Sequence, residues 1–561
     1  MKAGLSLPPV SRGTRRPCRI LSILAVLFVP LAHAAAPPGP RTEAFESARY
    51  AVALHVDAAR GSDATGDGTA ALPWASVTRA LEQTPATAQR VAILVSQGRY
   101  RQPTLVLKSR VDIFGGFASP GGARDILKFA TILDGDEAQR IALGADDARV
   151  DGVHFANGRV RGKGAALLCD GVSPVVTNCV FVANRTVIPR DWDPPQLHLT
   201  AHDGGAIMCL NAAAPRFEHC LFYHNTTECG RGGALACDRG AHPRIVSCVF
   251  ANNRAGLDDS KRSSDGGAVS YFDRSGGEFI GNVVVANRAL TRNDAGGVFV
   301  ALWSAPRLAE NIFVGNDGGD DAGGLFIGGQ EHRYGVPLDP VPPADRYTVV
   351  VERNIFAGNL NSSRNSGAMR VTMESRARFT DNLIAENAGG FYLQRSEIVA
   401  ERNTVWQDWR FLEDKASLGP SRFTGNILRG PLDQPIGARV TLTHNMAEPA
   451  AGGTGTLAVA DVFLDDGLAG RIASTRFDAA TFTTIVTTSA ELPAKASLAS
   501  RPVRIGPPKN GQWHVIKSAS GRELVLWGRL EAETKAPDQF DILRTFTLKT
   551  DAPAGIGARL P

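Results

Sequence analysis

The fold is decided by a repeated frame whose first two copies are PVVTNCVFVANR (174–185) and PRFEHCLFYHNT (215–226). The frame recurs in PRIVSCVFANNR (243–254), GEFIGNVVVANR (277–288), PRLAENIFVGND (306–317), VVVERNIFAGNL (349–360) and ARFTDNLIAENA (377–388). One column of this alignment holds Cys179, Cys220, Cys248, Asn282, Asn311, Asn354 and Asn382. Five residues later comes an unbroken column of Asn184, Asn225, Asn253, Asn287, Asn316, Asn359 and Asn387. Seven matches at a constant offset indicate a structural repeat.

A run of small residues precedes each copy, as in GGAIMC from Gly204 and GGALAC from Gly232. In five repeats, 15 residues separate the aligned small residue from the first column, as between Gly205 and Cys220. A period of roughly 20–45 residues built from short β-rich pieces is typical of a solenoid. We therefore expect each coil to consist of strand, turn, strand, tight turn, strand and a connection. The connections vary most in length, and such insertions commonly gather on the working face.

The strand that follows each small run alternates with period two, as a strand with one buried face requires. Two positions are apolar in every coil and are predicted to face inward: Ile207 and Cys209, Leu235 and Cys237, Val269 and Tyr271, Val298 and Val300, Leu325 and Ile327, Met369 and Val371, Phe391 and Leu393. The position between them is predicted to face outward and holds Met208, Ala236, Ser270, Phe299, Phe326, Arg370 and Tyr392.

The two asparagine columns have a structural explanation. A carboxamide stacked about 4.8 Å above its twin can donate and accept along the stack, so it satisfies a buried tight turn. Cysteine in the first three coils keeps that position small and buried. We therefore expect a ladder at each column and no catalytic role for either.

The first 34 residues combine five basic residues, the apolar run ILSILAVLFVPL and the small-x-small sequence Ala32-His33-Ala34. They predict a secretory signal peptide, and so a periplasmic or secreted protein without a transmembrane segment in its mature chain. Removing those five basic residues leaves 56 basic against 56 acidic residues, so no nucleic-acid partner is expected. Seven of the eight cysteines remain, and the geometry of neighbouring parallel strands favours free, buried thiols over disulfides.

The rest of the chain divides into three predicted parts. Residues 50–136 form an N-terminal cap and the first coils, with a short amphipathic helix through Val77, Ala80 and Leu81 that closes the open end of the core. Residues 137–446 form the solenoid. Residues 447–561 form a linker and a small β module, with strand-like runs TFTTIVTT, RPVRIG, WHVIKS and ELVLWGRL.

The GGA start followed by F-x-x-N resembles the repeats of right-handed parallel β-helix proteins of the pectin-lyase-like superfamily, and in particular those of polymorphic outer-membrane proteins. The segment GSDATGDGTAALPWASVTRAL (61–81) resembles the capping region that opens many secreted β-helix proteins. The resemblance covers about residues 50–445 and implies an all-β fold: a single-stranded right-handed parallel β-helix with a cap helix and a C-terminal β module. It implies no single activity, because the superfamily includes lyases, hydrolases, epimerases and binding proteins.

A column of mostly charged residues lies two positions before the aligned small residue: Asp203, Arg231, Asp265, Asp294, Asp321, Asn365 and Asn387. Stacked coils would place Asp265, Asp294 and Asp321 about 5 Å apart, where like charges repel unless a cation or a shared proton intervenes. Each could cap its own turn through an Asx bond. The alternatives are a calcium site, helped by Asp320, Asp258 or Asp259, and an acid/base pair for glycoside hydrolysis. The Asp320-Asp321 pair resembles that of galacturonan hydrolases, whose Gly-His-Gly and Arg-Ile-Lys sequences are absent.

A polysaccharide lyase must neutralise the uronate carboxylate beside the proton that it abstracts. Arg370 is the outward residue best placed for that task, and aromatic residues in the same row suit a platform for sugar rings or a secondary apolar cluster beneath the long loops. The catalytic candidates are Arg370, Asp265, Asp294 and Asp321; the calcium candidates are Asp265, Asp294 and Asp321; the substrate-binding candidates are Phe299, Phe326, Tyr392 and Arg395.

Two functional hypotheses follow. The first is a secreted protein that binds or processes a polysaccharide, in particular a uronate-containing one, as a lyase or glycoside hydrolase. The second is a non-catalytic cell-surface or adhesive β-helix protein, because no complete catalytic motif is present. Under both hypotheses we expect a monomer that binds a polysaccharide or cell-surface glycan, with Ca²⁺ as the one candidate cofactor. We expect the ligand along the strand that starts at each Gly-Gly.

Overall fold

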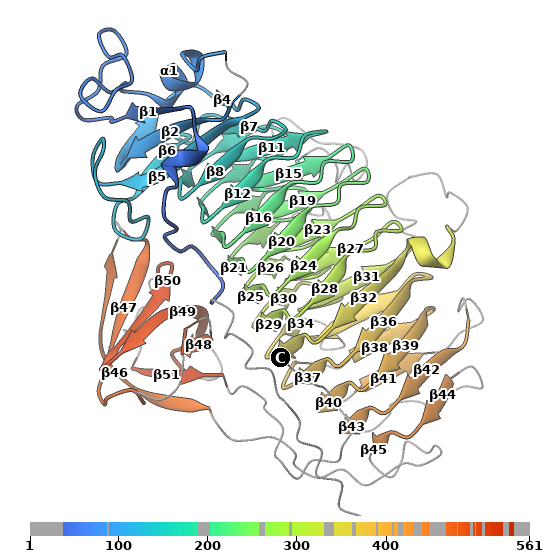
Figure 1. Ribbon diagram of the computed structural model, residues 1–561. Helices are drawn as coiled ribbons and strands as arrows, with labels where there is room; N and C mark the ends of the chain where they lie inside the picture. The colour runs from blue at the N-terminus through green and yellow to red at the C-terminus, as the bar shows by residue number, and fades with distance from the viewer. Residues whose placement is uncertain are drawn as a thin grey trace, which may run out of the picture. The chain divides into compact units, whose positions relative to one another are not determined.

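Successive coils of the chain stack strand upon strand around one apolar interior (Figure 1). The computed structural model describes residues 37–86, 89–188, 202–256, 264–290, 294–329, 342–361, 366–388, 391–406, 409–412, 419–429, 440–447, 467–478, 481–493, 498–499, 501–507, 511–530 and 538–543. The predicted signal peptide lies outside these residues. Four parallel sheets and one closed barrel make up the described chain.

Sheet A consists, in spatial order, of β1 (Val52–Val56), β2 (Val91–Ser96), β5 (Val111–Phe117), β8 (Arg149–Asp151), β12 (Val175–Thr177), β16 (Arg216–Glu218), β20 (Arg244–Val246), β24 (Glu278–Ile280), β28 (Arg307–Ala309), β32 (Thr348–Glu352), β36 (Arg376–Thr380), β39 (Glu397–Glu401), β42 (Ser421–Thr424) and β44 (Val440–Thr443). Sheet B consists of β3 (Gly98–Arg101), β6 (Thr131–Asp134), β9 (His154–Ala156), β13 (Val180–Val182), β17 (Leu221–Tyr223), β21 (Val249–Ala251), β25 (Val283–Val285), β29 (Ile312–Val314), β33 (Ile355–Ala357), β37 (Leu383–Ala385), β40 (Thr404–Trp406), β43 (Ile427–Arg429) and β45 (Met446–Ala447).

Sheet C consists of β4 (Leu105–Val106), β7 (Ala142–Leu143), β11 (Leu167–Asp170), β15 (Ile207–Leu210), β19 (Leu235–Cys237), β23 (Val269–Tyr271), β27 (Val298–Val300), β31 (Leu325–Gly328), β35 (Met369–Thr372), β38 (Phe391–Gln394) and β41 (Trp409–Leu412). Sheet D consists of β10 (Arg159–Val160), β14 (Arg185–Thr186), β18 (Thr226–Thr227), β22 (Arg254–Ala255), β26 (Arg288–Ala289), β30 (Asp317–Gly318) and β34 (Leu360–Asn361). In each sheet the spatial order of the strands follows the chain order, which confirms the predicted parallel β-helix.

Sheet D corrects the predicted coil, which had three strands. In the coils from β10 to β34 a fourth, two-residue strand follows the second asparagine column. Two residues are too few to show a period of two, so sequence alternation gives no signal for such a strand.

Both asparagine columns form the predicted ladders. In the first column, Asn282 Nδ2 donates to Asn311 Oδ1 at 3.0 Å, and Asn311 Nδ2 donates to Asn354 Oδ1 at 2.9 Å. In the second column, Asn287 Nδ2 donates to Asn316 Oδ1 at 2.9 Å. Each carboxamide oxygen also accepts a backbone N–H from the neighbouring coil, as Asn311 Oδ1 does from Asn282 at 2.8 Å. The ladders therefore satisfy backbone groups that tight turns would otherwise leave buried and unpaired.

The interior of the β-helix is filled by the residues predicted to face inward. The alternating pairs of sheet C, from Ile207 and Cys209 to Phe391 and Leu393, belong to one buried cluster. In sheet B, stacked phenylalanine rings continue this core, with centroids 4.8 Å apart between Phe181 and Phe222. The six cysteines of the inward columns are free and buried, which confirms that prediction: Cys169, Cys179, Cys209, Cys220, Cys237 and Cys248. Burial raises the pKa of Cys179 to about 12, so its thiol is unreactive at neutral pH.

The N-terminal end of the core is covered by α1 (Val77–Glu82), which buries the three predicted residues Val77, Ala80 and Leu81. The Ser76 hydroxyl caps this helix by accepting the Arg79 N–H at 3.1 Å. Two 3₁₀ turns, η1 (Ser47–Arg49) and η3 (Ala344–Arg346), complete the described helical segments.

The C-terminal module is a closed barrel in the order β46 (Leu468–Asp478), β47 (Thr483–Thr488), β50 (Glu523–Trp527), β49 (Gln512–Ser520), β48 (Pro502–Ile505) and β51 (Gln539–Ile542). Four of these strands lie in the predicted strand-like runs. The strands β46 and β51 were not predicted; β46 buries none of its residues, and its sequence LAGRIASTRFD shows no clear apolar alternation. The barrel has its own apolar core, which includes Val503, Ile516 and Leu526.

The barrel contains a buried histidine that makes stability depend on pH. Burial lowers the pKa of His514 to about 4, from about 6.5 for an exposed imidazole. Between pH 4 and pH 6.5, the His514 imidazole is therefore protonated in the unfolded chain but neutral in the folded barrel. The stabilisation is therefore complete above about pH 6.5 and is lost as the pH falls towards 4, by about 3 kcal/mol in total.

We expect His514→Gln to flatten the slope of unfolding free energy against pH between 6.5 and 4, whatever its effect at pH 7. Urea denaturation followed by tryptophan fluorescence would measure both slopes. Equal slopes for the two proteins would show that His514 does not titrate on unfolding.

Candidate functional site

The outward row of sheet C changes character along the β-helix. Strand pairing places Met208, Ala236, Ser270, Phe299, Phe326, Arg370 and Tyr392 side by side in the predicted order. The first five are buried, and only Arg370 and Tyr392 are partly exposed. Of these seven side chains, solvent therefore reaches only those of Arg370 and Tyr392, at one end of the row.

The expectation that Phe299 and Phe326 form an exposed platform is wrong. Both side chains have 0% exposure, and their rings stack at 5.2 Å between centroids. They pack with Phe272 and Leu302 in an apolar cluster outside the main core. The strand does direct them outward, but the apolar packing over them leaves no surface for a sugar. The alternative of a secondary apolar cluster is the one that the structure supports.

Arg370 lies in β35 and forms an ion pair with Asp321, which belongs to the preceding coil. Its guanidinium also lies 5.0 Å from the centre of the Tyr392 ring in β38. The side chain of Arg370 is 23% exposed and that of Asp321 is 11% exposed. An arginine, a carboxylate and an aromatic ring therefore meet at the edge of the accessible surface.

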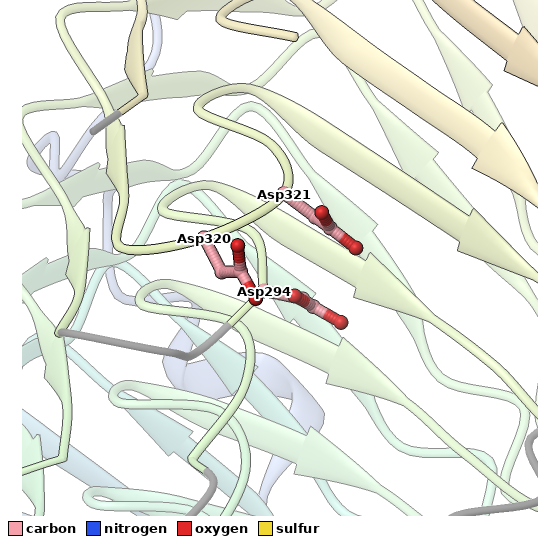
Figure 2. Close-up of side chains that lie close together, drawn as sticks. All are labelled: Asp294, Asp320 and Asp321. Carbon is pink, nitrogen blue, oxygen red and sulfur yellow. The ribbon is translucent and has the colours of Figure 1, made fainter. Parts of the chain in front are cut away.

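Two more carboxylates lie beside this ion pair. Oxygen atoms of Asp294, Asp320 and Asp321 all lie within 4.8 Å of one another. Figure 2 shows that Asp320 and Asp321 come from one turn and Asp294 from the neighbouring turn. Oxygen ligands at this spacing suit a hard cation such as Ca²⁺, which needs 6–8 oxygen ligands in all. The group fits the predicted calcium site in part, because it includes Asp294 and Asp321 and replaces Asp265 by Asp320.

Asp265 has a structural role at the next rung of the same column. Its Oδ1 accepts the backbone N–H of Asp294 at 2.9 Å. Asp203 does the same for the N–H of Arg231 at 2.8 Å. These carboxylates thus cap the backbone of the following coil, whereas an Asx turn would cap their own. The residues Asp258 and Asp259, named as possible calcium ligands, lie outside the described residues.

Arg231 interrupts the aspartate column and is fully enclosed. Its Nη2 lies 2.6 Å from Asp203 Oδ2 and 3.7 Å from Asp238 Oδ2, and its guanidinium stacks 3.5 Å from the centre of the Phe272 ring. Burial raises the pKa of Asp238, and the positive charge of Arg231 opposes that rise. With a side-chain exposure of 1%, Arg231 serves packing and charge balance.

Arg395, the remaining substrate-binding candidate, lies in the turn directly after β38. Its backbone carbonyl accepts the N–H of Glu374 at 2.9 Å. The residue is partly exposed, but the turn carries it past the end of the strand that holds Tyr392. Arg395 therefore lies at the edge of the region that holds Arg370 and Tyr392.

The contact between Arg370 and Asp321 was not predicted. The two residues occupy different columns, five positions apart in the repeat frame. The chain bends at Gly323 and Gly324 between the column of Asp321 and the strand of sheet C, so the long arginine side chain can reach back. A search for opposite charges in neighbouring coils, without the restriction to one column, would have found the pair.

The outer face of sheet A is occupied by ion pairs. Glu218 bridges Arg216 and Arg244, each at 2.7 Å, and Arg244 also contacts Glu278 at 2.9 Å. Arg307 continues the series between Glu278 and Glu352. The positive and negative charges on this face therefore balance one another. Each exposed ion pair contributes little to stability, about 0–1 kcal/mol.

The outer face of sheet B is apolar and buried. Leu221, Val249 and Val283 share one cluster with Val515 and Trp527 of the C-terminal segment. The Tyr223 hydroxyl also donates to the Arg529 carbonyl oxygen at 2.6 Å. The outer face of sheet B is therefore covered, in contrast to the charged outer face of sheet A.

The fold and the site define a right-handed parallel β-helix protein with a partly exposed arginine, aromatic and carboxylate group on the outer face of sheet C. Residues 130–318 match the family model described as "Right handed beta helix region". The match agrees with the resemblance of the repeat frame to right-handed parallel β-helix proteins. No curated protein matches the chain. Within the part of the chain that the structure describes, no helix is long and apolar enough to cross a membrane.

Proposed function

We propose that this protein is an extracytoplasmic β-helix protein that binds and cleaves a uronate-containing polysaccharide at Arg370. The observation that carries the proposal is the Arg370–Asp321 ion pair, which lies beside Tyr392 where the outer row of sheet C becomes accessible. The signal peptide predicted from the first 34 residues supports the location.

The chemistry of the group suits β-elimination. A uronate carboxylate can replace Asp321 on the Arg370 guanidinium, because arginine binds carboxylates through two parallel N–H donors. This contact neutralises the charge beside the C5 proton, which makes the proton easier to remove. Asp321, once released, would take that proton, while the bond from C4 to the leaving oxygen breaks, a C4–C5 double bond forms and the leaving oxygen takes a proton from water. The Tyr392 ring can pack against the C–H face of a sugar.

Hydrolysis is less well supported by the same contacts. A glycoside hydrolase needs one carboxyl group protonated as the general acid. An arginine partner stabilises the ionised form of a carboxylate, which works against that role for Asp321. A cation held by Asp294 and Asp320 would assist Arg370 in neutralising the substrate, so elimination also uses the neighbouring carboxylates.

The activity is tested by incubating the protein with polygalacturonate and with alginate and following the absorbance of unsaturated chain ends, with Ca²⁺ and with a chelator. We expect products from one of these polymers and a loss of kcat/KM of at least ~100-fold for Arg370→Ala, the order expected for removal of a group that stabilises developing charge. Arg378→Ala is the matched control, because Arg378 is an exposed arginine of β36 on sheet A.

The second candidate function is non-catalytic adhesion to a glycan. It is favoured by the burial of the outer row from Met208 to Phe326, which leaves a short accessible floor on sheet C. Binding of a polymer that depends on Arg370 but yields no unsaturated ends would select this function over cleavage.

A further inference from the structure

Sheet D presents a row of arginines that the proposed function does not use. In sheet D, the first residue of each short strand pairs with the first residue of the neighbouring strand. In spatial order these residues are Arg159, Arg185, Thr226, Arg254 and Arg288. Arg159, Arg185 and Arg288 are exposed and Arg254 is partly exposed, whereas the second residues of β14, β18, β22 and β26 are buried. We call these four arginines the arginine row.

The arginine row carries an excess of positive charge. Arg185 pairs with Glu228, and Arg254 Nε donates to the Gly256 carbonyl oxygen at 3.1 Å. Among the described residues, no ion pair engages Arg159 or the exposed flanking residue Arg161, and Arg288 interacts electrostatically with Asp317, its register neighbour on the next coil. Sheet A shows the opposite pattern, because its arginines alternate with glutamates that neutralise them. The excess charge is therefore local, in a chain whose predicted mature form is close to neutral.

The spacing of the row is set by the β-helix itself. Neighbouring strands lie about 4.8 Å apart, so five rungs from Arg159 to Arg288 span roughly 19 Å along the stack of coils. The row ends at Asp317 and Leu360, the next register neighbours. A ligand that matches this track must be linear, anionic and regularly charged over several repeats.

We propose that the arginine row binds a linear acidic polysaccharide that lies along the stack of coils. Extended polyuronates carry one carboxylate on each sugar, and their sugars follow one another at a spacing close to that of the coils. A guanidinium binds a carboxylate through two N–H donors, which suits the arginines at four of the five rungs. Single-stranded nucleic acids need aromatic side chains for base stacking, and no aromatic residue stands in the outward row of sheet D.

This inference adds a second contact for the polymer class named in the proposed function, but it rests on different residues. The row would hold the polymer whether or not a bond is cleaved at Arg370. The two ideas can therefore fail separately, and the closing experiment measures binding without relying on product formation.

The test compares two triple variants of the full chain that remove the same charge. The first, called the sheet D variant, has glutamine in place of Arg159, Arg161 and Arg288. The second, called the control variant, has glutamine in place of the exposed arginines Arg239, Arg378 and Arg522. Calorimetric titration in low salt uses polygalacturonate, fully methyl-esterified polygalacturonate and oligothymidylate as probes. Circular dichroism confirms that both variants are folded.

We expect the sheet D variant to bind polygalacturonate roughly 10-fold more weakly than the native protein, and the control variant to stay within about twofold. The loss should persist in an Arg370→Gln background, and the esterified polymer should not bind. Equal losses in both triple variants, or no binding of polygalacturonate by the native protein, would overturn the proposal. Equally tight binding of oligothymidylate, lost in the sheet D variant alone, would overturn the assignment to a polysaccharide.

Discussion

Replacing Arg231 by methionine will destabilise the β-helix by about 3–5 kcal/mol, the cost of leaving a buried charge without its partner. Arg231 lies 2.6 Å from Asp203, whose side chain is fully buried. Methionine fills similar space beside Phe272 but cannot neutralise the carboxylate. The unfolding free energy from urea denaturation, monitored by circular dichroism, measures the effect.

The matched control is the double variant Asp203→Asn with Arg231→Met. It removes both charges of the Arg231–Asp203 pair, leaves Asp238 with Lys163 at 3.7 Å and keeps an acceptor for the Arg231 backbone N–H, so we expect it to recover most of the lost stability. If the double variant is as unstable as the single one, the cost comes from lost packing against Phe272 and the ion pair is not the cause.

Replacing Asn311 by leucine will destabilise the coil stack by about 2–6 kcal/mol, because two buried backbone groups each lose a partner at about 1–3 kcal/mol. Asn311 Oδ1 accepts the Asn282 N–H at 2.8 Å, and its Nδ2 donates to the Phe279 carbonyl oxygen at 2.8 Å. Leucine has almost the same shape but neither group. The midpoint of urea denaturation, with the slope checked for constancy, reports the loss.

Asn311→Cys is the informative comparison, because cysteine already occupies this column at Cys248. There Sγ accepts the Cys220 N–H at 3.4 Å and donates to the Val246 carbonyl oxygen at 3.4 Å. A thiol should therefore restore part of the bonding, and we expect it to cost less than half as much as leucine. Equal costs would mean that the ladder acts through packing alone.

Much of the fold follows from the repeat frame, because a ladder requires the same residue at the same place in every coil. The asparagine columns, the inward apolar pairs and the cap helix all lie where the sequence predicts them. The two-residue strands of sheet D were missed since they are too short to carry a pattern. The arginine row was missed with them, although its residues directly follow the second asparagine column or lie one coil before it.

The candidate site was predicted less completely. Arg370 and Tyr392 are accessible as expected, and Asp294 and Asp321 do lie together. Phe299 and Phe326 are buried, Asp265 caps a backbone group, and Asp320 takes its place beside the other two carboxylates. The alternation of a strand tells which way a side chain points, but its exposure depends on what packs over it.

The sequence by itself determined the order of the coils, their register and the direction of the residues in the strands that follow each Gly-Gly, because in a solenoid a constant spacing along the chain becomes a constant neighbour in space. Only the tertiary structure decided which outward residues meet solvent and which charges pair, as for Phe326 under its apolar cluster and Arg370 with Asp321. Charge pairing is not encoded in the spacing of the columns, because long side chains cross from one column to another. Exposure is not encoded there either, because the residues that pack over a sheet lie outside the repeat.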